Sequence, residues 1–168
     1  MLKTDALSRP IPEVEAAEPI PAFADNGLDH FAPYLLNRIS ARWNSDLQLR
    51  LKEHNLNTIQ MRTLAVLSIM SGATVNELAV YTVTEQSTMS RALESMVREG
   101  LVCRQNRLGD ARVREVHLTE AGSEAFRRFW PEMHEAFTRM FSGLSDAEYE
   151  TLIRLLARVL RNIRRHEI

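Results

Sequence analysis

Apolar side chains recur at steps of three and four residues along most of the chain, which is the spacing of helices with one buried face. The pattern begins near Pro33 and predicts a long helix to about His54. Pro33 is compatible with this helix because proline is tolerated in the first turn. A second long helix is predicted to begin at Thr119 and end at Gly143. Pro131 lies inside this helix and predicts a kink, since proline removes a backbone hydrogen bond and crowds the preceding turn.

Shorter helices are indicated by polar residues that cap helix starts. A capping box pairs Ser, Thr or a similar residue with Glu or Gln three positions later. Such pairs are Asn57 with Gln60, Thr74 with Glu77, and Ser145 with Glu148. Either Asn57 or Thr58 is the predicted cap of the first of these helices, which runs to Gly72. Thr84 is the predicted cap of a further helix.

The helix after Thr84 has two faces of different chemistry. At about 100° per residue, Met89, Leu93 and Met96 form one apolar stripe. The opposite face is small, polar and cationic, and such side chains can approach bases and phosphates in a DNA groove. An ordinary solvated face would show the same pattern. The DNA contacts that we predict from this segment are Thr84, Gln86, Ser87, Thr88, Ser90 and Arg91.

An arginine-rich hairpin is predicted directly after that helix. Gly100 is the residue type that ends a helix in the left-handed conformation, and the segment 101–104 has strand character. Residues typical of turns follow at Asn106, Gly109 and Asp110. A second strand is then indicated by Val113, Val116 and Leu118. The alternation indicates a register break between Val113 and Val116. Because arginine suits phosphate forks and groove insertion, the predicted DNA contacts of this wing are Arg107, Asp110 and Arg112.

Several short motifs occur in a fixed order around the hairpin. They are Asn76-Glu77-Leu78-Ala79, Ser90-Arg91, Arg98-Glu99-Gly100-Leu101-Val102, Asp110-x-Arg112 and Leu118-Thr119-x-x-Gly122. Together they resemble the MarR (multiple antibiotic resistance regulator) family of winged helix-turn-helix proteins, with weaker similarity from about Pro33 to about Arg164. The resemblance implies homodimers that bind pseudopalindromic DNA, with a ligand pocket between the DNA-binding lobe and the dimerisation helices. It also implies that Arg112 enters the minor groove and that Asp110 holds it in place.

The predicted fold is therefore mainly α-helical. Residues 28–168 are expected to form a single domain, with a winged helix-turn-helix lobe at 57–118 and dimerisation helices at 33–56 and 119–168. The last helix carries an apolar stripe of Tyr149, Leu152, Leu155, Leu156, Val159 and Ile163. Stripes at both ends of the chain favour burial of the first and last helices across a two-fold axis, although an intramolecular bundle would use the same stripes.

Residues 1–27 differ in composition from the rest. Four prolines among Ala and Glu predict a flexible or extended acidic arm, whose few apolar residues leave docking on a neighbouring subunit open. Six acidic and two basic residues give the segment 1–30 a charge of −4, so the remainder carries +3 although the whole chain carries −1. A near-neutral total charge therefore does not oppose DNA binding, because local patches decide contact.

Aromatic residues of the long helices suggest a ligand pocket. Trp43, Phe129 and Trp130 are the predicted lining for a small aromatic or phenolic ligand, although aromatics at helical spacing also serve as ordinary core. Cys103 is the single cysteine, which excludes an intramolecular disulfide. Cys103 lies beside Arg104, and a neighbouring cation can lower the pKa of a thiol and make it reactive. Its apolar neighbours Leu101 and Val102 are instead typical of an inert strand residue.

Other functional classes receive less support from the sequence. The chain lacks the nucleophile elbow, P-loop, H-E-x-x-H and dinucleotide motifs, so we expect neither an enzyme nor a cofactor. The five histidines show no close metal-ligand spacing, but folding could bring some of them together, so a zinc-responsive regulator stays an alternative. A winged-helix module that binds protein is a further alternative. Without a bilayer-spanning run or a signal-peptide pattern, we expect a cytoplasmic protein with no membrane contact.

Overall fold

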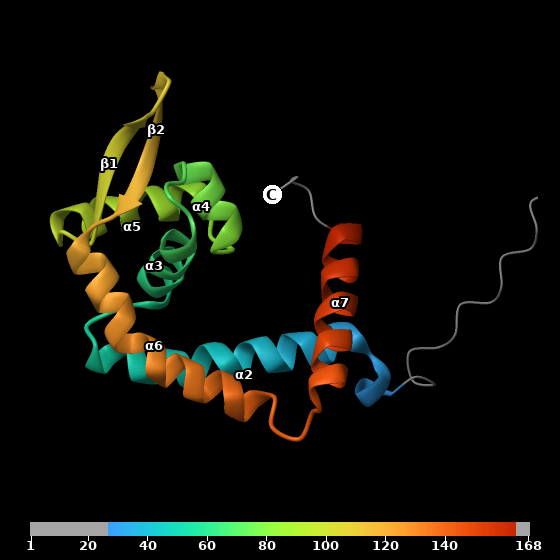
Figure 1. The fold of residues 1–168 in the computed structure, drawn as a ribbon. Helices are drawn as coiled ribbons and strands as arrows, with labels where there is room; N and C mark the ends of the chain where they lie inside the picture. The colour runs from blue at the N-terminus through green and yellow to red at the C-terminus, as the bar shows by residue number, and fades with distance from the viewer. Residues whose placement is uncertain (1–26, 164–168) are drawn as a thin grey trace, which may run out of the picture. The chain divides into compact units, whose positions relative to one another are not determined.

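The structure is a computed structural model that describes residues 27–163, and Figure 1 shows its elements. In chain order they are η1 (Leu28–His30), α2 (Ala32–Glu53), α3 (Thr58–Ile69), α4 (Val75–Tyr81), α5 (Gln86–Arg98), β1 (Val102–Arg107), β2 (Asp110–Leu118), α6 (Glu120–Met140) and α7 (Asp146–Ile163). The mainly helical fold with a two-stranded antiparallel wing is confirmed. The predicted acidic arm lies outside the described residues apart from its last position.

The chain divides into two compact units, one up to Ser40 and one from Ala41 onward. In the first unit, η1 leads into the first turns of α2, where the Arg38 guanidinium lies 5.8 Å from the centre of the Tyr34 ring. The second unit holds the remainder of α2 and all later elements.

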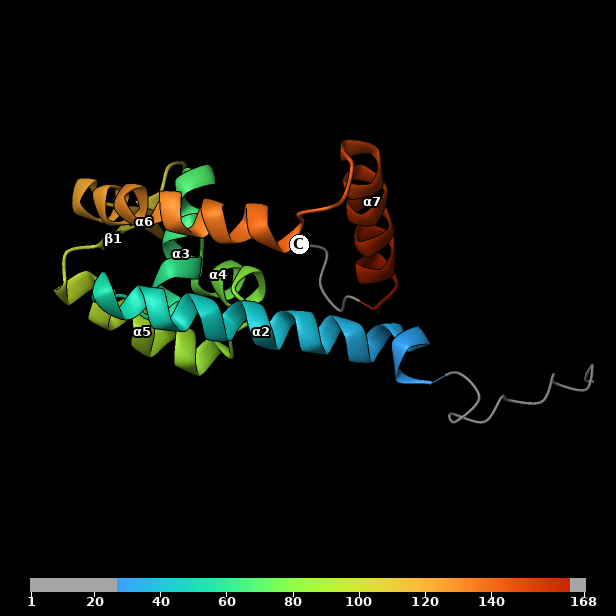
Figure 2. The same ribbon diagram turned by 90° about the horizontal axis from the view of Figure 1, so that it is seen from below.

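The hydrophobic core of the second unit joins the short helices to the base of the wing. The predicted apolar stripe of α5 is confirmed, because Met89, Leu93 and Met96 are all completely buried. Leu51 from α2 and Phe129 from α6 enter the same core. Figures 1 and 2 show α3, α4 and α5 gathered beside the wing. Helix α5 is thus packed through one face, and its opposite face is exposed or half-buried.

The three predicted capping boxes are present. Asn57 and Gln60 exchange backbone-to-side-chain hydrogen bonds of 3.0 and 2.9 Å, and Thr74 with Glu77 repeats the arrangement. Ser145 and Glu148 do the same at the start of α7. These bonds satisfy amides that have no partner within the helix.

The prediction that Thr84 caps α5 is wrong. The N-cap is Glu85, which makes no side-chain capping bond. The Thr84 hydroxyl is instead engaged in the preceding turn, where it donates to the Thr82 carbonyl at 3.3 Å and lies 3.1 Å from the Thr82 hydroxyl. Val83, between them, has a left-handed φ of 54°. The turn between α4 and α5 therefore has its own hydrogen bonds and is not simply the first turn of the helix.

The wing is longer than the sequence indicates. Asn106, predicted in the turn, belongs to β1 and pairs with Arg114, so the turn itself is Leu108 and Gly109. The left-handed φ of 89° at Gly109 explains the glycine there. The register break also lies earlier than predicted, because Arg107 pairs with Asp110 and the segment 111–113 bulges from the ladder.

The base of the wing is fixed to the helices by hydrogen bonds. Ala73, after α3, exchanges backbone hydrogen bonds of 3.1 and 2.8 Å with Val116 of β2. At the end of β2, the Thr119 hydroxyl caps α6 by accepting from the Gly122 amide, and it donates to the Gly100 carbonyl at 2.6 Å. These contacts tie the wing to the ends of α5 and α6.

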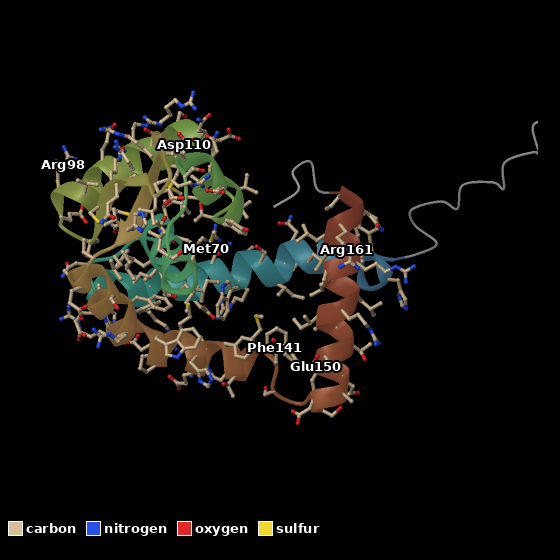
Figure 3. All side chains as sticks on the ribbon, turned by 45° about the horizontal axis from the view of Figure 1, so that its top comes forward. Met70, Arg98, Asp110, Phe141, Glu150 and Arg161 are labelled. Carbon is tan, nitrogen blue, oxygen red and sulfur yellow. The ribbon has the colours of Figure 1, made fainter. Side chains whose placement is uncertain are left out.

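The helix α6 contains Pro131, as the sequence predicts, and Figure 1 shows it as a bent helix. It ends at Met140, earlier than the predicted Gly143. Its aromatic side chains continue to α7, since Phe137 and Phe141 lie 5.9 and 5.0 Å from the Tyr149 ring. Figure 3 shows Phe141 and Glu150 near this junction. Within residues 27–163, no helix is both long enough and apolar enough to cross a bilayer.

Candidate nucleic-acid interface

The exposed face of α5 presents short polar side chains and one arginine. Ser87 and Arg91 are exposed, whereas Thr88 and Ser90 are half-buried along the same helix. The Arg91 guanidinium lies along this surface, with Nε 3.4 Å from the Ser87 carbonyl and Nη2 3.5 Å from the Thr88 hydroxyl. Both contacts are at the distance limit of hydrogen bonding, so they are weak. The Arg91 guanidinium can therefore leave them to bind a phosphate or a guanine edge.

The start of α5 is fixed to α4 through two amides. Gln86 donates from Nε2 to Asn76 Oδ1 at 2.7 Å, and both side chains are exposed. Asn76 was not among the predicted contacts, and its position in the first turn of α4 gives no signal by itself. An amide pair of this kind can hold Gln86 toward a base edge, or Asn76 can contact a phosphate beside it.

The wing offers Arg112 as a cation at its surface. The Arg112 side chain is 95% exposed, and its Nε lies 3.5 Å from Asp110 Oδ1. The same Asp110 oxygen accepts a hydrogen bond from the Arg112 backbone amide at 3.1 Å. Arg112 thus lies in the bulged segment 111–113 of β2, and Asp110, which pairs with Arg107, lies directly before that segment.

Arg107 differs from Arg112 although both lie in the wing. Its Nε donates to Glu115 Oε1 across the hairpin, and this contact raises the pKa of Arg107 above its ordinary value. Glu115 also lies 3.5 Å from Nε2 of His117, so its carboxylate joins two side chains of the wing. Arg107 therefore makes a closer ion pair than Arg112, and 42% of its side chain is exposed against 95% for Arg112.

The predicted DNA contacts come from two adjoining elements. Figure 3 shows side chains projecting from α5, where Arg98 is labelled, and from the wing, where Asp110 is labelled. Thr84 is the exception among the predicted residues, because it is half-buried in the turn before α5. Its role in the structure is to shape that turn.

A cavity of about 530 Å³ lies between α3 and α6. Its lining is Ala65, Ser68, Ile69, Ser123, Phe126, Arg127, Trp130 and Met133. Of the three predicted pocket residues, Trp130 lines this cavity. Phe129 is completely buried in the core, where its ring packs 5.2 Å from His54, and the half-buried Trp43 packs against the same core. Phe129 and Trp43 are therefore core residues, which is the alternative that their helical spacing also permits.

The sequence also leaves metal and thiol chemistry open as alternatives. Among the described residues, no group of three His, Cys, Asp or Glu side chains is placed to hold a metal ion. Cys103 is a half-buried residue of β1, and the Gln105 amide lies 3.5 Å from its sulfur.

Comparison with known proteins agrees with this geometry. The family model described as MarR family matches residues 54–112. A repressor named IacR from Pseudomonas putida is 28% identical over 143 residues, which cover 85% of this chain and 86% of that protein.

Solved structures extend the match over most of the chain. A MarR family transcriptional regulator from Silicibacter pomeroyi has a TM-score of 0.82 and 40% identity, with coverage of 88% of this chain and 100% of that one. The MepR protein of S. aureus, solved as a complex with DNA, has a TM-score of 0.67 and 25% identity over 79% of this chain and 98% of its own. The chain belongs to the MarR family of winged-helix transcriptional regulators.

Proposed function

We propose that this protein is a repressor that binds a pseudopalindromic DNA operator as a homodimer and that a small aromatic ligand weakens this binding. The residues of the DNA contact are those of the α5 face and the wing, with Ser87, Arg91 and Arg112 as its exposed centre. The observation that carries the proposal is the pairing of an exposed polar helix face with a wing arginine held by a neighbouring carboxylate. A helix in the major groove and an arginine in the minor groove use these two features.

The homodimer is supported by apolar residues that the single chain leaves uncovered. The described part of α7 has no buried residue, although Leu155, Val159 and Ile163 follow one face. The beginning of α2 likewise exposes Leu36 and Ile39. Apolar helix faces of this kind are stabilised by burial against a second copy.

A charge placed on the apolar face of α7 tests the dimer. Leu155→Glu is expected to shift the protein toward monomer in sedimentation velocity, because a carboxylate in an apolar interface is costly to bury. The matched control is Ala157→Glu, an exposed position on the polar side of the same helix. A wild-type protein that sediments as a monomer would remove the dimer from the proposal.

DNA binding is tested with the protein's own upstream intergenic DNA, titrated with salt. A DNA reader is expected to bind it selectively and with a steep salt dependence, since each phosphate contact releases counterions. A winged-helix module that binds protein instead would keep its function without Arg91 and Arg112. Equal affinity for operator and unrelated DNA, at every salt concentration and at other promoters too, would favour that alternative.

The ligand is supported by the cavity between α3 and α6. Its lining combines the aromatic rings of Phe126 and Trp130 with the Ser68 and Ser123 hydroxyls and the cationic Arg127. Apolar walls with a few polar groups are typical of small-molecule sites. A ligand that favours a different spacing of the two recognition helices lowers operator affinity. The test is to repeat the DNA titration with a simple phenolic acid, 4-hydroxybenzoate, and to look for weaker binding.

A further inference from the structure

One guanidinium joins three elements of the second unit. Arg62, half-buried on α3, donates from Nη2 to Asn44 Oδ1 of α2 at 2.7 Å. From Nη1 it donates to the backbone carbonyl of Thr82 at 3.0 Å. Thr82 is the C-cap of α4 and lies directly before the turn that leads into α5. The fork therefore connects α2 and α3 to the end of α4, directly before the turn that leads into α5.

The turn that receives this contact is closely defined. Thr82 is completely buried, and its hydroxyl donates to the Leu78 carbonyl at 2.7 Å. Val83 has a left-handed φ of 54°, which is costly for a β-branched residue. The Thr84 amide donates to the Ala79 carbonyl at 2.9 Å. A turn constrained in this way passes a displacement of Thr82 on to the first residues of α5.

The Arg62 link, which is the pair of hydrogen bonds from Arg62 to Asn44 and Thr82, depends on the geometry of the guanidinium. Arginine presents a planar fork with fixed donor geometry, so both bonds depend on one orientation of the group. The apolar packing of Leu47 and Leu51 in the core is less directional and tolerates small sliding of α2. Two residues before Arg62 on α3, the Gln60 amide donates to Glu99 at 2.6 Å, next to the C-terminal end of α5. The polar contacts thus fix α5 near both of its ends.

We propose that Arg62 is a positioning residue that couples α2 to the recognition helix and so sets the distance between the two recognition helices of the dimer. The inference rests on the proposed function, in which α2 takes part in the dimer and α5 reads DNA. A rigid link between them makes operator affinity depend on the separation of the half-sites. A loosened link lets each lobe adjust independently.

Two variants break the link in different ways. Asn44→Ala removes the α2 end and leaves the bond to Thr82 in place. Arg62→Lys keeps the charge but loses the fork. Gln48→Ala, an exposed position one turn further along α2, is the matched control. Urea melts establish that each variant is folded before DNA binding is measured.

The main measurement is affinity for the operator and for versions with one base pair added or removed between the half-sites. Wild type and Gln48→Ala are expected to lose affinity steeply when the spacing changes. Both link variants are expected to reduce this spacing penalty by about threefold or more, as mutations between coupled sites commonly do. A loss of stability alone would lower affinity for all three operators equally. Link variants with the wild-type spacing profile would overturn the proposal.

Amide hydrogen exchange gives a readout that does not need DNA. The Thr84 amide is expected to exchange faster in both link variants than in wild type and Gln48→Ala. In Arg62→Lys the turn loses the fork that holds the Thr82 carbonyl, and in Asn44→Ala the guanidinium that holds this carbonyl is no longer fixed to α2. Unchanged exchange in both link variants would overturn the coupling even if no operator is found. Absence of selective DNA binding by the wild type would instead count against the proposed function, so the two failures are distinguishable.

Discussion

Asp110 holds Arg112 through two contacts, one to its backbone and one to its side chain. The carboxylate accepts the Arg112 amide at 3.1 Å and lies 3.5 Å from the guanidinium Nε, while 95% of the arginine side chain stays exposed. Asp110 therefore restricts the direction in which Arg112 leaves the wing without covering it. Such an arrangement lowers the conformational entropy lost when the arginine enters a groove.

Arg112→Ala is expected to weaken operator binding by about 1–3 kcal/mol, the range for an arginine that reads a groove. The salt dependence should also become shallower, because one cation fewer displaces counterions. Fluorescence anisotropy with labelled operator at several salt concentrations measures both quantities. Arg128→Ala is the matched control, since Arg128 is an exposed arginine of α6 beside Glu124. Unchanged operator affinity in a folded Arg112→Ala protein would remove the groove assignment.

Asp110→Asn tests the positioning role separately. The amide oxygen still accepts the backbone bond, but the ion pair with the guanidinium is lost, so Arg112 samples more directions. We expect weaker operator binding with a salt dependence no shallower than that of wild type, because removing an acidic side chain removes no phosphate contact. Affinity equal to or higher than that of wild type would show that orientation by Asp110 contributes nothing and that its charge merely opposes DNA.

Gly122→Ala is expected to reduce the free energy of unfolding by about 3 kcal/mol, the upper part of the range for overpacking a core. A Cβ at this position would lie 2.0 Å from the Leu101 carbonyl oxygen, and a backbone atom cannot move aside cheaply. Urea unfolding measures the change. Ser123→Ala, the next residue of α6, is the control and is expected to stay near wild type. A stable Gly122→Ala protein would mean that α6 and the start of the wing can separate without cost.

The motif Leu118-Thr119-x-x-Gly122 shows how far the sequence leads. Its resemblance to a family signature identified the fold, and capping-box spacing located the starts of three helices. The reason for the motif was not visible in the sequence, because Gly100, Leu101 and Gly122 meet only when the ends of α5 and α6 come together. Local patterns report local hydrogen bonds, while this contact depends on tertiary packing.

The candidate site was predictable to a similar extent. Helical periodicity separated the buried stripe of α5 from its exposed face, so the polar residues of the face were identified correctly as exposed or half-buried. Periodicity gave no sign that Thr84 serves the preceding turn or that Glu115 holds Arg107. It also could not separate Phe129, which is core, from Trp130, which lines a cavity, because neighbouring aromatics on one helix differ only in what packs against them.

The capping box of α4 is expected to make stability depend on pH. Hydrogen bonds from the backbone and side chain of Thr74 lower the pKa of Glu77 below 4.5. Its contribution is therefore present above pH 4.5 and is lost as the pH falls through the lowered pKa. Glu77→Gln should lose stability relative to wild type at neutral pH, and the difference should shrink in acid.

Urea unfolding of wild type and Glu77→Gln at pH values well above and well below 4.5 measures this difference. Glu53→Gln, at the exposed end of α2, is the matched control and should show a smaller change at either pH. Thr74→Ala should cost about 1 kcal/mol at neutral pH, as the loss of a capping side chain commonly does. A Glu77→Gln difference that is the same at both pH values would show that the carboxylate charge is not what stabilises the cap.

Ser68→Phe is expected to make operator binding insensitive to ligand. Ser68 is an exposed residue of α3 that lines the cavity opposite Trp130, so a phenyl group there would occupy the space a small aromatic ligand needs. Affinity for the operator without ligand should stay near that of wild type, because the DNA-contacting face of α5 is untouched. Titration with 4-hydroxybenzoate, read by tryptophan fluorescence and by operator release, compares the two proteins. Gln48→Phe on the exposed side of α2 controls for adding an aromatic side chain. If 4-hydroxybenzoate releases the operator equally from wild type and Ser68→Phe, the ligand binds elsewhere and the cavity between α3 and α6 is not its site.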